Sequence, residues 1–124
     1  MSNRPLVLLV EDFEDARELA AEYLRDSGFE VATAGDGAEA IARAAELAPA
    51  LIILDLVLPI VDGWEAIRRL REDSQTRLIP IIVTSGNKSD DDRRRCAELG
   101  CVGYLQKPCP PATLVAKIRE ALHD

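Results

Sequence analysis

The chain has 124 residues, of which 48% are apolar, so it can bury one hydrophobic core and has no room for a second domain of ordinary size. Its net charge of −7 repels nucleic acid phosphates and anionic membrane surfaces, and we therefore expect no direct nucleic acid binding and no membrane insertion. No segment resembles a signal peptide or a membrane-spanning helix, which favours a cytoplasmic location.

Short runs of aliphatic and β-branched residues predict five strands. They are Leu6–Val10, Val31–Ala34, Leu51–Leu54, Ile79–Val83 and Val102–Leu105. Several of these runs are apolar at every position rather than at every second position. That pattern is typical of strands that are covered on both faces, as in a parallel sheet.

The segments between the strands have the period of amphipathic helices. In the first helix, one apolar stripe is formed by Ala16, Leu19, Ala20, Tyr23 and Leu24. The second helix can begin at a capping Asp36 and end before Pro49. We expect its inward face to consist of Ala38, Ile41, Ala42 and Ala45. Asp62 and Gly63 introduce the third helix, which is expected to bury Trp64, Ile67 and Leu70.

The fourth helix, about Ser89–Leu99, has an unusual composition. Three aspartates are followed by three arginines, so only Cys96, Ala97 and Leu99 remain for the core. Acidic residues in the first turn and basic residues later complement the helix dipole, and one interpretation is therefore a capped helix with a solvated face. The other interpretation is a weakly docked helix that can move and present a surface to a partner.

The fifth helix begins near Pro110 and Pro111 and is expected to bury Leu114, Val115, Ile118 and Leu122. It ends close to the last residue, so we expect a single domain over residues 1–124 without an effector domain. Alternating strands and helices predict right-handed βαβ units in an α/β sandwich. Such sheets bind their ligands at the carboxyl ends of the strands.

Neither the cysteines nor the histidine predicts a site. Cys96, Cys101 and Cys109 are odd in number and lack the spacing of a zinc or redox pair, so we expect free thiols. His123, the only histidine, lies near the end of the sequence and is expected to be a solvated residue without a role.

Polar residues stand where four predicted strands end. They are Glu11 and Asp12 after the first, Asp55 after the third, Thr84 and Ser85 after the fourth, and Lys107 after the fifth. Taken singly, each has a structural explanation as a cap, a turn residue or a solvated side chain. Three carboxylates in one pocket, however, repel one another unless a cation neutralises them. Oxygen ligands without histidine or thiolate favour Mg²⁺, which can also bind a phosphoryl group.

The residues at these strand ends lie in four segments: VLLVED at 7–12, LDLVLPIVDG at 54–63, IIVTSG at 81–86 and GYLQKP at 103–108. In this order and at these spacings, they resemble bacterial response-regulator receiver domains of two-component systems, over essentially the whole chain. The stand-alone regulators of the chemotaxis type are the most similar in organisation. The resemblance implies a flavodoxin-like (βα)5 three-layer sandwich with a parallel five-stranded sheet of order 2-1-3-4-5.

The resemblance also implies a role for each residue. Asp55 would accept a phosphoryl group from a phosphohistidine on a sensor histidine kinase or a histidine phosphotransfer protein. Asp12, Asp55 and the backbone carbonyl of Val57 would bind Mg²⁺, while Glu11 would hold the ion through water or orient Asp12. Lys107, preceding a cis-proline, would neutralise the phosphoryl oxygens, and Thr84 would donate a hydrogen bond to one of them.

In this family, a phosphorylated receiver changes its surface. The Thr84 hydroxyl would be drawn inward and Tyr104 would rotate into the vacated space, although a tyrosine in a strand can equally be a packing residue. The surface altered would be the fourth helix, the fifth strand and the fifth helix. Such a protein is a signalling switch that catalyses its own phosphorylation and dephosphorylation, rather than an enzyme with a separate substrate.

Two alternatives remain at this point. A Mg²⁺-dependent phosphatase with an aspartyl nucleophile has a similar set of residues, but it needs a second aspartate two positions after the nucleophile, where this chain has Val57. A receiver-like module that binds partners without phosphorylation is the other alternative. The sequence names no cognate kinase and no downstream target, and it leaves phosphorylation-dependent dimerisation open.

Overall fold

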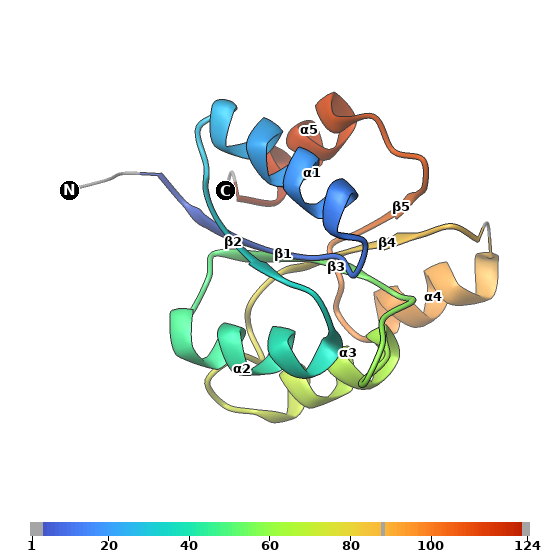
Figure 1. Ribbon diagram of the computed structural model, residues 1–124. Coiled ribbons are helices and arrows are strands. Elements are labelled where there is room, and N and C mark those ends of the chain that lie inside the picture. Colours follow the sequence, from blue (N-terminus) through green and yellow to red (C-terminus); the bar gives the residue numbers. More distant parts are fainter. Residues whose placement is uncertain (1–3, 88, 123–124) are drawn as a thin grey trace.

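The computed structural model describes residues 4–87 and 89–122, in which five strands and five helices alternate along the chain (Figure 1). The strands are β1 (Leu6–Val10), β2 (Glu30–Ala34), β3 (Leu51–Asp55), β4 (Ile81–Ser85) and β5 (Gly103–Gln106). The helices are α1 (Glu14–Asp26), α2 (Gly37–Leu47), α3 (Gly63–Glu72), α4 (Asp90–Glu98) and α5 (Pro111–Leu122). His123 lies outside the described residues. Within them, no helix is long and apolar enough to cross a membrane.

All five strands are parallel and lie in the order β2-β1-β3-β4-β5, which confirms the predicted flavodoxin-like sandwich. In the register of the sheet, Val10 pairs with Leu54, and Asp55 pairs with Thr84. The carboxyl ends of the strands therefore meet at one edge. The chain adds strands outward in both directions from β1 and β3, and the point of reversal between them is where such sheets bind ligands.

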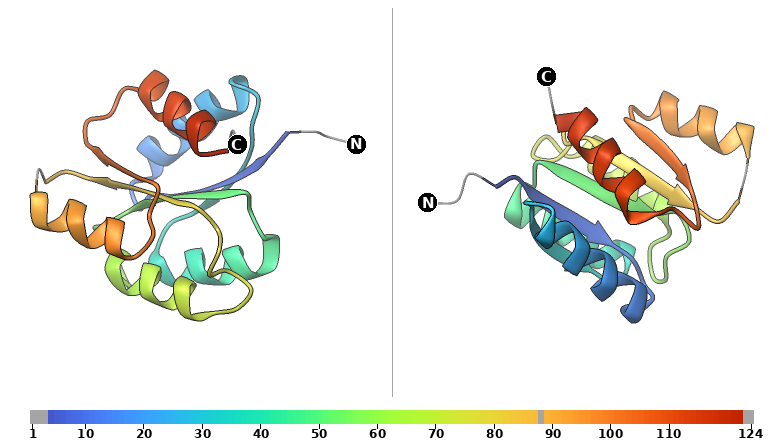
Figure 2. Two further views of the ribbon diagram at one scale, coloured as in Figure 1. Left: turned by 180° about the vertical axis from the view of Figure 1, so that it is seen from behind. Right: turned by 90° about the horizontal axis from the view of Figure 1, so that it is seen from above.

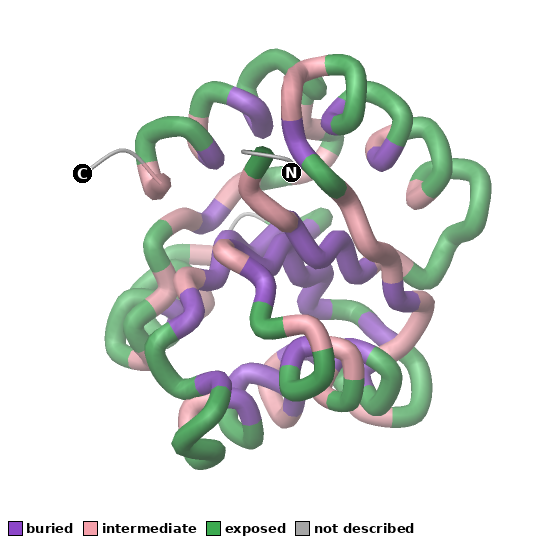
Figure 3. The backbone as a smooth tube through the Cα atoms, turned by 90° about the vertical axis from the view of Figure 1, so that its left-hand side faces the viewer, coloured by how far each residue is buried: buried purple, intermediate pink, exposed green. Residues whose placement is uncertain are grey.

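Helices cover both faces of the sheet. Helices α1 and α5 lie side by side on one face, and α2, α3 and α4 cover the other (Figures 1 and 2). Along β1, Val7 and Leu9 pack toward α1 and α5, whereas Leu8 and Val10 pack toward the opposite layer. This two-sided burial explains why the strands are apolar at every position. Figure 3 shows the buried residues concentrated in the strands and on the inner turns of the helices.

The buried face of α1 differs from the predicted stripe. Leu24 is buried as expected, but Leu19 is 69% exposed and Tyr23 is 41% exposed. Ala21, which lies outside the predicted stripe, is fully buried. The small alanine lets the helix backbone approach the sheet closely, and the larger side chains are left on the flank of the helix.

Helix α2 also turns a different face inward. Its buried residues are Gly37, Ala40 and Ala44, Ile41 is partly buried, and the exposed residues include Ala38, Ala42 and Ala45. Alanines occur all round this helix, so hydrophobicity alone does not distinguish its faces. The ends are as predicted, because the Asp36 side chain accepts a hydrogen bond from the Glu39 N–H at 2.7 Å and the helix stops before Pro49.

Helix α3 buries Ile67 and Leu70 as predicted, while Trp64 is only partly buried and its ring lies 4.1 Å from the guanidinium carbon of Arg95 in α4. Helix α4 buries only Cys96 fully, and it lies at the β5 edge of the sheet (Figure 2). Ala97, predicted to face the core, is exposed. The composition of α4 therefore correctly predicted a helix with few buried side chains.

The remaining elements agree with prediction except at their ends. Helix α5 buries Leu114, Val115 and Ile118, and Leu122 is partly buried. Strand β4 begins two residues later than predicted, after Pro80, which lacks the N–H that a strand interior requires. Strand β5 begins one residue later. All three cysteines are free, as expected.

Candidate functional site

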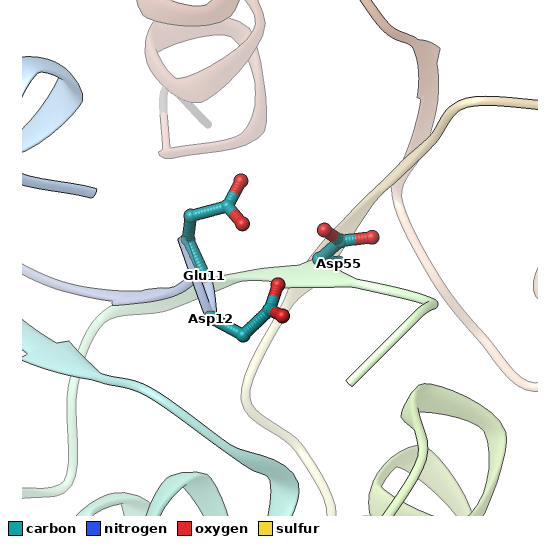
Figure 4. A group of neighbouring side chains, drawn as sticks. All are labelled: Glu11, Asp12 and Asp55. Carbon is teal, nitrogen blue, oxygen red and sulfur yellow. The ribbon is translucent and has the colours of Figure 1, made fainter. Parts of the chain in front are cut away.

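The carboxyl ends of β1 and β3 bring three acidic side chains together. Glu11 and Asp12 follow β1 directly, and Asp55 is the last residue of β3. Each offers one carboxylate oxygen to a cluster in which these atoms lie within 4.8 Å of one another. Figure 4 shows the three carboxylates at the neighbouring ends of the two strands, with Asp12 directed toward Asp55. The cluster consists of hard oxygen donors, so it suits a hard divalent cation.

Lys107 brings a positive charge to the same cluster. Its Nζ donates hydrogen bonds to Oδ2 of Asp55 and to Oε1 of Glu11, each at 2.7 Å. Lys107 follows β5 and reaches across β4, because β3 and β5 are not neighbours in the sheet. The backbone N–H of Lys107 donates to the carbonyl oxygen of Ser85 at 2.7 Å, and the Lys107-Pro108 peptide is cis, as the resemblance implied.

These contacts determine the charge states at the site. Burial alone raises the pKa of Glu11, but the hydrogen bonds from Lys107 and from the Phe13 N–H outweigh burial and leave this pKa below its usual value. Burial likewise lowers the pKa of Lys107, but its bonds to the two carboxylates outweigh burial and leave the pKa raised. Lys107 is therefore protonated at neutral pH. One ammonium group does not balance three carboxylates, so the cluster can accept a further cation.

The acceptor candidate Asp55 lies in a well-defined environment. It is 6% exposed, and its Oδ1 accepts a hydrogen bond from the Val57 N–H at 3.1 Å. Thr84 is its register partner in β4 and is 8% exposed. The Leu56 N–H donates to the Thr84 carbonyl oxygen at 3.1 Å, so the chain after Asp55 stays attached to β4. The two oxygens of the Asp55 carboxylate thus have different partners, the Val57 N–H at Oδ1 and Lys107 at Oδ2.

Tyr104 lies inside the protein in this structure. The residue is 7% exposed, and its hydroxyl donates to the carbonyl oxygen of Asn87 at 3.0 Å. The guanidinium carbon of Arg93 lies 4.9 Å from the ring centroid. The sequence led us to expect that Tyr104 rotates inward after phosphorylation, whereas here the ring already occupies an inward position without any modification.

Some residues around the site were not identified from the sequence. Arg17 of α1 donates through Nη1 to the carbonyl oxygen of Glu11 at 3.0 Å, and Asn87 and Arg93 contact Tyr104. These residues belong to no recognisable motif. Their contacts join separate segments of the chain, so only the arrangement of the loops reveals them.

Comparison with known proteins agrees with this fold. Residues 7–119 match the family model of the response regulator receiver domain. The transcriptional regulatory protein PrrA of Mycobacterium tuberculosis is 42% identical over 118 residues, which is 95% of this chain and 50% of PrrA. The DNA-binding response regulator MtrA of Mycobacterium leprae is 36% identical over 119 residues, which is 96% of this chain and 52% of MtrA. The chain thus spans about half the length of these relatives.

Solved structures show the same architecture. The chemotaxis response regulator CheY4 of Vibrio cholerae superposes with a TM-score of 0.90 at 32% identity, covering 97% of this chain and 100% of CheY4. The receiver domain of a Pseudomonas aeruginosa sensor histidine kinase, with a magnesium ion in its active-site cleft, gives a TM-score of 0.88 at 30% identity. That likeness covers 98% of this chain and 99% of the receiver domain.

The chain belongs to the response regulator receiver domain family. Proteins of this family are switches in two-component signalling, and receiver domains are phosphorylated by histidine kinases.

Proposed function

We propose that this chain is a phosphorylation-dependent signalling switch in which Asp55 accepts a phosphoryl group from a phosphohistidine of a histidine kinase or a histidine phosphotransfer protein. The observation that carries the proposal is the pair of 2.7 Å hydrogen bonds by which Lys107 joins Asp55 to Glu11 within the acidic cluster. The hydrogen bonds support the proposal because a buried carboxylate beside a positive charge can act as a nucleophile toward an anionic phosphoryl group.

Three side chains of this site, Asp55, Lys107 and Thr84, act on the phosphoryl group of the donor. An oxygen of Asp55 attacks phosphorus and forms an acyl phosphate, the phosphorus–nitrogen bond of the donor breaks, and the donor imidazole, protonated beforehand on its other ring nitrogen, leaves as the neutral ring. Lys107 then shifts its hydrogen bond from the carboxylate to the phosphoryl oxygens. Thr84, beside Asp55 in the sheet, donates its hydroxyl hydrogen to another of these oxygens.

Mg²⁺ fits the residues present. Asp12, Asp55 and the backbone carbonyl of Val57 would hold the ion, and Glu11 would contact it through water, since Glu11 already binds Lys107. The bound ion would neutralise the charge that the carboxylates and the phosphoryl group bring together. The magnesium ion in the related Pseudomonas receiver domain supports this assignment.

The proposed output depends on Thr84 and Tyr104. Movement of the Thr84 hydroxyl toward a phosphoryl group would change the packing beside Tyr104, whose hydroxyl already bonds to the loop before α4. The ring is inside beforehand, so phosphorylation would stabilise this position rather than create it. The surface formed by α4, β5 and α5 would then adopt a single conformation in a larger fraction of the molecules. This conformation would bind a downstream protein or a second copy of the chain.

We propose that residues 1–124 act as one receiver unit that makes no direct contact with nucleic acid. The names of PrrA and MtrA refer to transcription and DNA binding, but these proteins are about twice as long as the matched region. The net charge of −7 supports a protein partner rather than DNA.

The test is incubation of the protein with acetyl phosphate and Mg²⁺, followed by measurement of the intact mass. We expect wild type to gain one phosphoryl group and Asp55→Asn to gain none. A phosphoryl gain in Asp55→Asn would reject Asp55 as the acceptor. A phosphoryl gain that EDTA leaves unchanged would reject the role of the ion. Steady release of phosphate from a small phosphate ester would favour a phosphatase, and binding of a partner without any phosphorylation would favour a silent module.

A further inference from the structure

The β3–α3 loop, residues 56–62, joins Asp55 to α3 and contains a strained turn. Ile60 has a φ of 70°, in the left-handed region that β-branched residues rarely adopt. The Val61 N–H donates to the carbonyl oxygen of Pro59 at 2.8 Å and closes a three-residue turn around Ile60. The Ile60 side chain is 81% exposed, so its own contacts do not compensate for the strain. The surrounding structure must therefore hold the turn.

Gly37, the first residue of α2, lies against this turn. Its N–H donates to the carbonyl oxygen of Pro59 at 3.5 Å. A Cβ atom at position 37 would lie 1.8 Å from the carbonyl oxygen of Val61 and 2.7 Å from its carbonyl carbon. These are backbone atoms, so any side chain at this position would force the loop to move. Only glycine allows the loop to rest directly on α2.

The other end of the loop folds back onto Asp55. The Gly63 N–H donates to the carbonyl oxygen of Leu56 at 3.0 Å, and a Cβ atom at Gly63 would lie 2.8 Å from the carbonyl oxygen of Asp55. Between the two contacts, the Val57 N–H donates to Oδ1 of Asp55. Only a few residues separate the turn at Ile60 from Val57, so a displacement of this turn will also displace the backbone of Val57.

We propose that Gly37 is a positioning residue for the phosphoryl acceptor site. Its close contact with the β3–α3 loop holds Val57 and Asp55 in the arrangement that binds Mg²⁺ and accepts a phosphoryl group. This inference rests on the proposed function, because it names what sets the geometry of that site. Gly37 contacts neither the ion nor the phosphoryl group and acts only through the loop backbone.

The test compares Gly37→Ala with Ala45→Gly, an exposed position in the same helix. Ala45→Gly lowers helix stability without touching the loop, so it controls for a general loss of stability. The Mg²⁺ dissociation constant is measured from the fluorescence of Trp64, and the initial rate of phosphoryl gain from the intact mass. We expect Gly37→Ala to weaken Mg²⁺ binding and slow phosphoryl gain by roughly 10-fold to 100-fold each. Ala45→Gly should change both by less than about twofold.

A second change tests whether the loop transmits the effect. Glycine at position 60 accepts a positive φ without strain and lets the turn adjust to a Cβ atom at position 37. Ile60→Gly should therefore restore part of the Mg²⁺ affinity of Gly37→Ala and leave that of Ala45→Gly unchanged. Equal Mg²⁺ affinities of Gly37→Ala and wild type would overturn the inference, and so would equal losses in Gly37→Ala and Ala45→Gly.

Amide exchange in metal-free wild type gives a test that does not depend on a folded variant. If contact with Gly37 holds the loop, the Val61 and Gly63 N–H groups should exchange far more slowly than in an unfolded chain. Exchange at unfolded-chain rates would show that the loop is held by the ion instead and would overturn the inference. Failure of wild type to gain a phosphoryl group would reject the proposed function, while the Mg²⁺ titration would still decide on Gly37.

Discussion

Asp12 is the most exposed member of the acidic cluster, and the electrostatic environment of its carboxylate differs from that of the other two. The hydrogen bonds of Lys107 go to Glu11 and Asp55, so these carboxylates have a direct cationic partner. Asp12 adds negative charge close to both of them. In the absence of a cation, its charge therefore opposes folding, whereas in the proposed function it would be a ligand of the bound cation.

Asp12→Asn should consequently have opposite effects with and without Mg²⁺. In EDTA, we expect the variant to be about 0.5–1 kcal/mol more stable than wild type, because a like-charge interaction is removed. Saturating Mg²⁺ should stabilise wild type by about 2.7 kcal/mol at 100 times its dissociation constant, and the variant by much less. Urea unfolding followed by circular dichroism measures both, with Glu22→Gln on α1 as a control for loss of a distant charge. If the variant remained more stable than wild type in Mg²⁺, this result would contradict a role for Asp12 in binding the ion.

Glu65, in the first turn of α3, should titrate unusually low. Hydrogen bonds from Arg68 and Arg69 lower the pKa of Glu65 to about 2. Since the folded pKa is depressed, the contribution of Glu65 to stability is present above its ordinary value of 4.5 and is lost as the pH falls toward 2. NMR titration of the side-chain carboxyl carbon should show Glu65 still ionised at about pH 3, where ordinary glutamates are largely protonated. In Arg68→Gln, the midpoint should move toward the ordinary value.

At the scale of the elements, Arg71 of α3 attaches the C-terminal end of α4 to two other segments of the chain. The guanidinium of Arg71 donates to the carbonyl oxygens of Leu99 at 2.9 Å and Gly100 at 3.3 Å, at the end of α4. It also donates to the carbonyl oxygens of Arg77 and Ile79 in the α3–β4 loop, at 2.9 and 2.8 Å. The C-terminal end of α4 is thus held firmly. The preceding turns bury few side chains, which suits a helix that moves at its N-terminal end.

Arg71→Met should destabilise the protein by about 2–4 kcal/mol, because carbonyl groups at partly buried positions lose a charged donor. Arg69 lies on the same helix, but it is exposed and its ion pair is with Glu65. Arg69→Met should therefore lower the free energy of unfolding by less than about 1 kcal/mol. Urea unfolding of the two variants measures the difference. Equal effects would show that the contacts of Arg71 contribute no more than an ordinary surface ion pair.

At the scale of the whole molecule, two hydrophobic clusters share one sheet. Ile118 of α5 belongs to one cluster and Ile67 of α3 to the other, and the central strands contribute alternate residues to both. Loss of packing on either face therefore weakens the strands that support the opposite face. We expect the molecule to unfold as a single cooperative unit.

Ile118→Ala should lower the free energy of unfolding by about 2–5 kcal/mol through loss of buried methyl groups and the cavity left behind. Trp64, the only tryptophan, packs with the opposite cluster. Its fluorescence transition in urea should nevertheless shift to the same midpoint as the far-ultraviolet circular dichroism. Separate midpoints for the two signals would show that the faces unfold independently.

The elements and the site residues were largely predictable from local patterns. Aliphatic runs predicted the strands. Asp36 was correctly identified as a cap and Asp62 as the start of the third helix, because a cap depends only on residues within the first helical turn. The residues at the strand ends were also identified in advance. Parallel strands necessarily bring their carboxyl ends to one edge, and the strand order that the resemblance implied predicted the proximity of Asp12, Asp55 and Lys107.

The inward faces of α1 and α2 were predicted only in part, because hydrophobic period does not show how closely a helix approaches the sheet. Leu19 is exposed although it is strongly apolar, and Gly37 is buried although it has no side chain. In both helices, small residues decide the contact, and their effect depends on backbone atoms of another element. No pattern within one helix contains that information.

The sequence by itself therefore determined the class of fold, the order of the elements and the residues gathered at the strand ends, because each depends on short-range periodicity and on the geometry of parallel sheets. Only the tertiary structure decided which helix faces are buried, where Tyr104 lies, how Arg71 fastens α4 and how Gly37 supports the β3–α3 loop. These features arise from contacts between segments far apart in the chain, and their energies depend on distances that no local pattern specifies.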